Sequence, residues 1–375
     1  MDWIFEGIRV LSRDPIYDLV LKIVLIQTIL VLTTLNAVLL FRVVRNSLDT
    51  RRARVRRRIE PRLLEYLEGQ LDEAWMNVAL RKLPKSELRG LLLKHFEVTS
   101  GRARERLVEL YIQLGFDKAD VRGTYSWAWW RRANALRALG RLENEAFRPV
   151  FLRTLRDKHE LVGIEAAKAL GCVGDVRGLE ALAEMVRHPS RWAALLFAEV
   201  ARKVGPEGLA YVRGLVADDP RPAVRATALD ALRIARDMGC ADVVRPLLAS
   251  EDKELRARAV KTLSEVGAVD TVPDILRLLN DEAWEVKAQA VKAVARLGSD
   301  EQVFRALRWA LGDQSWWVRL NAAQGLVSLG ERGRSILTEV SRTSPDPFAR
   351  DIATYVMRNG ATPSSATTTI AHERG

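Results

Sequence analysis

Along most of the chain, apolar residues recur at helical spacing in segments that repeat about every 31 residues. Residues 281–298 and 313–330 align without a gap as DEAWEVKAQAVKAVARLG and DQSWWVRLNAAQGLVSLG. Reading back from the residue that closes each copy places the closing positions at residues 140, 174, 205, 236, 267, 298 and 330. A second helical pattern, such as residues 303–311, follows the closing glycine, so each unit is predicted to be a helical hairpin.

Stacking follows from this pattern, because one hairpin cannot bury its apolar face alone. The short side chains of Ala290 and Ala322 would let neighbouring helices approach, and a closing glycine would supply a left-handed helix cap. We therefore predict an all-α protein with a right-handed α-solenoid over residues 123–360. Helical patterns near residues 61–79, 85–96 and 102–114 predict a leading or capping region over residues 59–122.

The N-terminal part carries a different pattern, an uncharged run over residues 23–41 that reads IVLIQTILVLTTLNAVLLF. At about 1.5 Å per residue this run spans about 28 Å, which is enough to cross the hydrocarbon core of a bilayer. A cleaved signal peptide is the alternative, but the preceding residues are not basic and no small-residue cleavage site follows. We expect a single transmembrane helix over residues 19–44 after an extracytoplasmic segment, residues 1–18.

Arginines follow this run in a linker over residues 45–58, and they predict its orientation because they resist translocation. The N-terminus is expected outside and the solenoid in the cytoplasm, with the protein in the inner membrane. The same arginines could bind anionic lipid headgroups or nucleic acid. The arginine run of this linker consists of Arg51, Arg52, Arg54, Arg56, Arg57 and Arg58.

The overall charge adds little to this picture. The formal net charge is +11, of which +6 lies in residues 1–58, so the rest of the chain is close to balanced. A small polar tail over residues 361–375 is predicted to be disordered. Two cysteines, Cys172 and Cys240, cannot form a disulfide framework, and we expect no metal or other cofactor.

The repeated pattern D-x-x-x-x-V-R/K-x-x-A-x-x-A-L/V-x-x-L-G in residues 281–298 and 313–330 resembles HEAT repeats of the short, phycobilisome-lyase-like variety. The single span, the arginine run and a WWRR element at residues 129–132 also resemble bacterial membrane-anchored HEAT-repeat proteins. This resemblance implies a partner such as a membrane glycosyltransferase of an exopolysaccharide system. HEAT-like di-iron enzymes use several His-Glu pairs, whereas only His159 and Glu160 form one here, so an enzyme is not expected.

A cation recurs at one place in four consecutive copies, each time with an acid ahead of it. A basic ladder of this kind could bind an acidic protein or a nucleic acid backbone. The alternative is a structural ladder in which the preceding acids, Asp219, Asp252, Asp281 and Asp313, pair with the cations and cap the helices. We favour the structural ladder, whose cations are Arg225, Arg256, Lys287 and Arg319.

Tryptophan is the remaining candidate for function, with ten residues against nine phenylalanines. Several tryptophans occupy the fourth or fifth place of their copies, in the turn leading into the second helix. They could pack between adjacent turns, or they could form an edge that binds a protein partner. The residues of this candidate edge are Trp127, Trp129, Trp130, Trp192, Trp284, Trp316 and Trp317.

These patterns predict a membrane-tethered scaffold or adaptor that binds membrane-associated protein partners, with no small-molecule substrate. The alternatives are a membrane-associated nucleic-acid binder and, with less support, a lyase-like HEAT enzyme.

Overall fold

The computed structural model describes residues 15–71 and 84–359, with only the backbone described at residues 15–18, 21, 43–56 and 58. About 81% of the chain is helical, and the described residues contain no strand, which confirms the all-α prediction. The helices group into two compact units, Met1–Phe116 and Asp117–Gly375, which are described separately. The predicted extracytoplasmic segment and C-terminal tail lie mostly or wholly outside the described residues.

The first unit is dominated by one long helix, α2 (Pro15–Leu67). Its stretch Lys22–Arg42 has a mean hydropathy of 2.3 and no buried residues, and it is long and apolar enough to cross a membrane. The helix continues through residues 45–58, where the sequence predicted a linker, because that stretch has no glycine or proline and is rich in arginine, a good helix former.

The C-terminal end of α2 packs against α5 (Gly101–Gln113), which also contacts α4 (Lys85–His95). Leu63 and Leu67 of α2 are buried, as are Leu107 and Tyr111 of α5. These contacts give the first unit a small apolar core at one end of the long helix.

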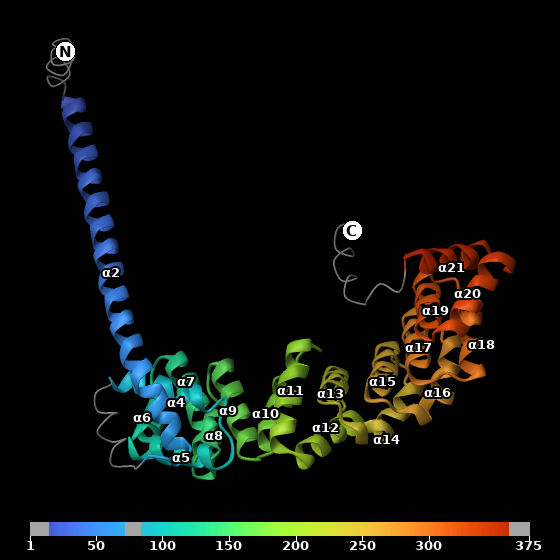
Figure 1. Cartoon of the computed structure of the whole chain (residues 1–375), viewed down its shortest axis with the longest axis horizontal. Coiled ribbons are helices and arrows are strands. Elements are labelled where there is room, and N and C mark those ends of the chain that lie inside the picture. The colour runs from blue at the N-terminus through green and yellow to red at the C-terminus, as the bar shows by residue number, and fades with distance from the viewer. Residues whose placement is uncertain (1–14, 72–83, 360–375) are drawn as a thin grey trace. The chain divides into compact units, whose positions relative to one another are not determined.

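The second unit starts with α6 (Phe116–Gly123) and continues as two layers of helices that follow the chain in order from green to red in Figure 1. In the first layer each helix contacts the next, and we call it the stacked layer. Its members are α7 (Trp129–Arg141), α9 (Glu160–Cys172), α11 (Arg191–Val204), α13 (Pro222–Ala235), α15 (Lys253–Val266), α17 (Trp284–Leu297), α19 (Trp316–Ser328) and α21 (Pro347–Asn359).

The second layer is less regular, because several of its members are short and extended by 3₁₀ turns. Its α-helices are α8 (Arg148–Thr154), α10 (Arg177–Met185), α12 (Pro206–Asp218), α14 (Ala241–Val244), α16 (Val272–Arg277), α18 (Glu301–Ala310) and α20 (Glu331–Thr343). The 3₁₀ turns are η1 (Glu145–Phe147), η2 (Met238–Cys240), η3 (Arg245–Ala249), η4 (Val269–Thr271) and η5 (Leu278–Asn280). The repeat pattern thus yields helical hairpins, as predicted, and the handedness of the solenoid stays a prediction.

Small residues allow the close stacking of the first layer. Ala290 and Ala322 are fully buried where the sequence predicted close approach between helices. At Gly325 of α19, an added Cβ atom would lie 2.8 Å from the Cβ atom of Ala295 on α17. A side chain larger than hydrogen at Gly325 would therefore push the two helices apart.

The predicted glycine caps are only partly correct. Positive φ angles occur at Gly174, Gly205, Gly267 and Gly330. Gly140, in contrast, lies inside α7, and Gly298 has an extended φ of −132°, so the prediction is wrong at both positions. The closing position of the fourth copy holds Arg236, which adopts φ of 56° although it carries a Cβ atom. Helix termination therefore does not depend on glycine in every copy.

Candidate partner-binding surface

Cations at one position of the stacked layer tie some of the repeats to the next. Arg256 on α15 donates hydrogen bonds to the carbonyl oxygens of Ser250 and Glu251, at 2.8 and 3.0 Å, in the turn before its own helix. It also forms a bidentate pair with Asp281, in the turn before α17, at 2.7 and 2.8 Å. The side chains of this pair are mostly buried, so the bond joins two repeats from within the array.

Two other contacts between successive helices of the stacked layer, which we call joints, contain an ion pair at the same position. Arg132 on α7 pairs with Asp157 before α9 at 2.7 and 2.8 Å, and Lys287 on α17 pairs with Asp313 before α19 at 2.5 Å. The sequence did not place Arg132 in the ladder. The sequence pattern also predicted that each cation pairs with the acid ahead of it in its own copy. In the structure these three cations instead bind the acid of the following repeat.

The protonation states follow from this pairing. Burial raises the pKa of Asp281, but hydrogen bonds from Arg256 and from the backbone N–H of Ala283 outweigh it, so the pKa lies below its ordinary value. The hydrogen bond to Asp281 raises the pKa of Arg256. Both groups therefore stay charged at neutral pH, and their charges are neutralised within the array.

The ladder is interrupted in the middle of the unit. Its cation position holds Gly163 in α9 and Ala194 in α11, so neither helix can donate a bond to the following turn. Arg225 in α13 has a serine, Ser250, at the acid position of the next repeat. It donates instead to the carbonyl oxygen of Val216 at 3.0 Å. Three successive joints, from α9 to α15, therefore lack the ion pair of the ladder, although Arg258 of α15 pairs with Asp230 of α13 across the last of them.

The last predicted cation, Arg319, has a different environment again. It donates to the carbonyl oxygens of Asp313 and Gln314 at 2.7 and 3.1 Å, in the turn before its own helix. Its guanidinium group also lies 5.1 Å from the ring centre of Phe348, in the turn region that opens α21.

The predicted tryptophan edge lies at the start of helices in the stacked layer. Trp129, Trp284 and Trp316 are the first residues of α7, α17 and α19. All seven side chains are exposed, and Trp127 has the largest exposed fraction, 82%. They are therefore not buried between adjacent turns within this chain.

The edge divides into two groups. The N-terminal aromatic group lies over α7, α9 and α11, and it includes an exposed leucine, Leu161, one repeat after Trp130 and one before Trp192. The next two copies have Ala223 and Glu254 at this position, which ends the group. The N-terminal aromatic group consists of Trp127, Trp129, Trp130, Leu161 and Trp192. The C-terminal aromatic group consists of Trp284, Trp316, Trp317, Phe348 and Tyr355.

Ring contacts hold parts of each group together. Trp129 stacks on His159 with ring centres 4.2 Å apart, and Trp127 meets Trp130 edge to face at 5.8 Å. Trp316 and Trp317 meet edge to face at 4.8 Å. These contacts order the rings while leaving much of their surface exposed, which lowers the entropy lost when a partner covers them.

The C-terminal group borders a hollow of about 410 Å³, which is lined by Trp316, Arg319, Phe348, Asp351, Ile352 and Tyr355. The repeat pattern did not reveal Phe348 and Tyr355, because both follow residue 330, its last closing position. Their helix, α21, is one further member of the stacked layer and packs against α19.

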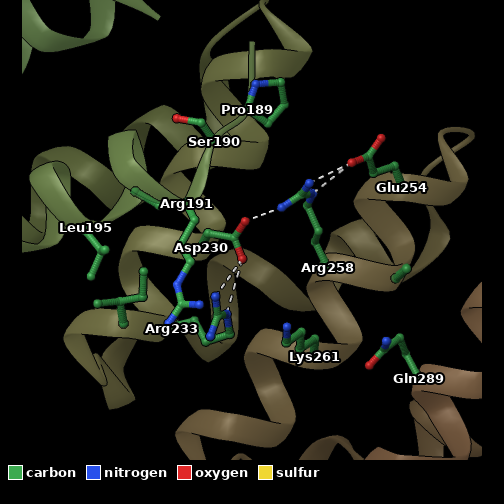
Figure 2. A pocket seen from close by; sticks show the side chains of 13 residues that line it. Pro189, Ser190, Arg191, Leu195, Asp230, Arg233, Glu254, Arg258, Lys261 and Gln289 are labelled. Carbon is green, nitrogen blue, oxygen red and sulfur yellow. Dashed lines mark hydrogen bonds and ion pairs between the residues drawn. The ribbon is translucent and has the colours of Figure 1, made fainter. Parts of the chain in front are cut away.

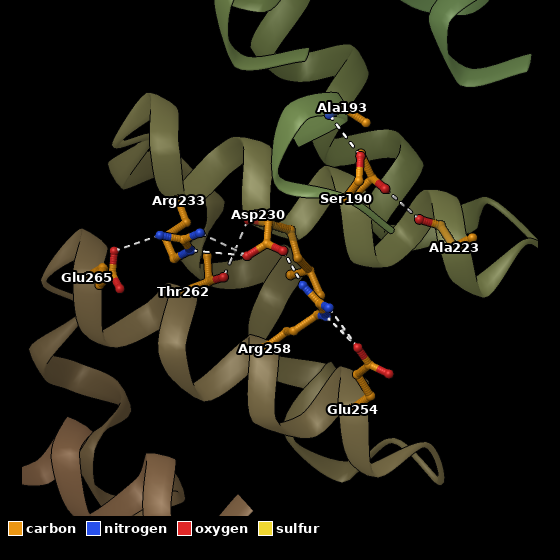
Figure 3. Close-up of polar contacts among 11 residues, drawn as sticks. Ser190, Ala193, Ala223, Asp230, Arg233, Glu254, Arg258, Thr262 and Glu265 are labelled. Atoms are coloured by element: carbon orange, nitrogen blue, oxygen red, sulfur yellow. Dashed lines mark hydrogen bonds and ion pairs between the residues drawn. The ribbon is translucent and has the colours of Figure 1, made fainter. Parts of the chain in front are cut away.

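A larger hollow of about 780 Å³ lies over α11, α13 and α15, and we call it the charged hollow. Its centre is a network around Asp230, which binds Arg233 at 3.0 Å and also binds Arg258, as Figure 2 shows. Figure 3 shows that Arg258 continues to Glu254, at 2.6 Å, and that Arg233 continues to Glu265, at 3.0 Å. Nothing in the sequence marked this hollow, because its residues come from four repeats, α17 contributing Gln289.

The other predicted residues are described only in part. The arginine run lies in α2, and Arg57 is exposed, while the side chains of its other members lie outside the described set. Among the described residues, no group of three His, Cys, Asp or Glu side chains could hold a metal ion. Desolvation raises the pKa of the buried Cys240 thiol to about 11, which keeps it protonated at neutral pH.

The two-layer arrangement matches a known family. A family model for HEAT repeats matches residues 125–202, 209–293 and 272–358. The chain belongs to the HEAT-repeat family. These HEAT repeats cover the whole stacked layer from α7 to α21 almost without interruption. The sequence-based identification of HEAT repeats is confirmed.

Several solved structures are similar to this HEAT-repeat chain, all at low identity. An engineered protein is 18% identical, with a TM-score of 0.37 over 79% of this chain and 97% of its own. Human deoxyhypusine hydroxylase in complex with glycerol is 19% identical, with a TM-score of 0.29 over 66% and 91%. A mutant of Kap121p is 12% identical, with a TM-score of 0.46 over 77% and 38%.

Likenesses this distant tell nothing about the function of the chain. In the comparison with curated proteins, no sequence matches.

Proposed function

We propose that this HEAT-repeat protein is a non-enzymatic, membrane-tethered scaffold that binds protein partners through its aromatic edge. The observation that carries the proposal is the exposed N-terminal aromatic group, in which Trp130, Leu161 and Trp192 hold one register over three neighbouring helices. A contiguous exposed apolar surface is costly to leave in water and is typical of a protein interaction site. Tryptophan is also enriched among the residues that dominate binding energy.

The tether is supported by the apolar stretch Lys22–Arg42 of α2 and by the arginines that follow it. In this proposal the stretch spans the cytoplasmic membrane, the N-terminus is outside and the HEAT repeats are in the cytoplasm. A membrane glycosyltransferase of an exopolysaccharide system, which the family resemblance implies, would be a partner of the expected kind.

A matched pair of tryptophans tests the aromatic edge. Trp192, in the N-terminal aromatic group, and Trp309, on α18 in the second layer, each have an exposed fraction of 57%. Proteins crosslinked to the full chain in native membranes should be lost or reduced about tenfold or more in Trp192→Ala, since a tryptophan that is a binding hot spot contributes about 2 kcal/mol or more. They should persist in Trp309→Ala.

Equal partner lists for wild type and Trp192→Ala would remove the edge from the proposal. Topology needs a separate test. A reporter that works only in the cytoplasm should be active when fused after Gly375 and inactive when fused before Trp3. Reversed activities would overturn the cytoplasmic placement and every partner inferred from it.

A further inference from the structure

The charged hollow has acids that are already neutralised by its own arginines. Asp230 accepts from Arg233 and Arg258, and Glu254 accepts from Arg258. Figure 2 shows this network across the middle of the hollow. The acids therefore offer little free negative charge to a ligand.

Cations at the border of the hollow are not matched in the same way. In the described parts of the chain, neither Arg191 nor Lys261 has an ion pair within 4.0 Å, and both line the hollow. Lys292, one repeat after Lys261 in the same register, has none either. Partial desolvation and the positive charge of Lys261 lower the pKa of Lys292, as expected for cations that lack a nearby acid.

The remaining lining is apolar apart from Ser190 and Gln289. Leu195 of α11 is 46% exposed, and Ile234 of α13 faces the same hollow together with two alanines and one proline. Leu195 lies one helical turn after Arg191 and Trp192, so the hollow continues the surface of the N-terminal aromatic group. A ligand here meets cations at the border and apolar side chains between them.

We infer that the charged hollow docks an acidic segment of a protein partner, whose carboxylates bind Arg191 and Lys261 and whose apolar side chain packs on Leu195 and Ile234. This inference rests on the proposed scaffold function and names the chemistry of its partner. A nucleic acid fits less well, because Asp230 and Glu254 interrupt the cations that an unbroken row of phosphates would need. It would also leave Leu195 without an apolar contact.

A selection from a random 12-residue peptide library on the full-length protein in lipid nanodiscs tests the inference without knowledge of the partner. The selected peptides should be enriched in Asp and Glu, with an apolar residue between the acids. Their affinity should fall at least tenfold in the double variant Arg191→Glu plus Lys261→Glu and should weaken with added salt.

The matched control reverses two exposed cations of the second layer, Arg305→Glu plus Arg342→Glu, which changes the net charge by the same amount. Its affinity for the selected peptides should stay within twofold of wild type. Thermal melts of both double variants establish that each is folded.

Three outcomes would overturn the inference. The first is a selection without enrichment in acidic residues. The second is that the selected peptides bind the double variant of Arg191 and Lys261 as tightly as wild type. The third is that binding of a random 20-base DNA duplex depends on Arg191 and Lys261 while peptide binding does not. If peptide selection fails while partner capture still depends on Trp192, the acidic occupant is wrong and the scaffold stands. If capture is insensitive to Trp192 while the peptides bind the hollow, the aromatic edge is wrong and the hollow stands.

Discussion

Among the described glycines, Gly333 in α20 leaves the least room for a side chain. A Cβ atom added there would lie 1.9 Å from the carbonyl oxygen of Leu326 on α19, whereas an ordinary carbon–oxygen contact is about 3.3 Å. The oxygen belongs to a helix backbone and cannot rotate away, so Gly333→Ala must move α20 by about 1.4 Å. That shift would disturb the packing of the buried side chains of Leu337 and Val340.

Overpacking of this kind costs about 1 to 3 kcal/mol, and the better helix propensity of alanine offsets about 1 kcal/mol. We expect Gly333→Ala to lower the free energy of unfolding by about 0 to 2 kcal/mol. The matched control is Gly214 in α12, where an added Cβ atom meets nothing within 4 Å. Gly214→Ala should raise the same free energy by about 0.5 to 1 kcal/mol.

Urea unfolding of the full chain in detergent measures both changes, and hydrogen exchange in α19 and α20 shows whether the loss is local. Local readout matters because a repeat array need not unfold in one step. If Gly333→Ala were as stable as Gly214→Ala, the two layers would not be in the close contact from which the cost is calculated.

Three further predictions concern the ladder, the buried thiol and the tether. Asp281→Asn should lower the free energy of unfolding by about 1 to 3 kcal/mol at pH 7. Since the pKa of Asp281 is lowered in the folded state, its pairing with Arg256 stabilises the fold at neutral pH, and the difference between variant and wild type in urea titrations should shrink below about pH 4. Cys240 should resist iodoacetamide at pH 8 until the chain is unfolded, because its pKa is about 11, and mass spectrometry of alkylated Cys240 from folded protein would contradict this. Replacing residues 23–41 with an unrelated apolar helix should preserve partner capture, whereas deleting residues 1–58 should abolish it. The reason is that tethering supplies an effective concentration of about millimolar. If the deletion variant captured partners as well as wild type, the tether would be dispensable.

The repeat architecture could be predicted from the sequence because its signal is local and occurs many times. The spacing of Ala290 and Ala322, for example, identifies a close-packed helix face in each copy without any knowledge of contacts between copies. Helix ends were less predictable, since Gly298 and Arg236 show that a turn can satisfy its backbone with or without glycine at the same position.

Pairings between copies were the part that a single copy could not reveal. Arg256 stands four residues after Asp252 in the sequence but binds Asp281, 25 residues away. The charged hollow has the same origin, because Arg191, Asp230 and Lys261 belong to three successive repeats. Which of two acids meets a cation depends on the rotation between neighbouring hairpins, and that rotation is set by packing rather than by spacing along the chain.

The interruption of the ladder has a mechanical consequence. Joints closed by a buried bidentate pair, such as Arg132 with Asp157, resist separation, because pulling them apart breaks two charge-assisted hydrogen bonds at once. The joints after α9 and α11, at Gly163 and Ala194, have no such bond, and the ion pair of Lys168 with Glu199 that crosses the first of them is more exposed. Under tension along the stack, the joints from α9 to α13 should therefore part before those closed by the buried pairs, which concentrates the elastic give of the array beside the charged hollow.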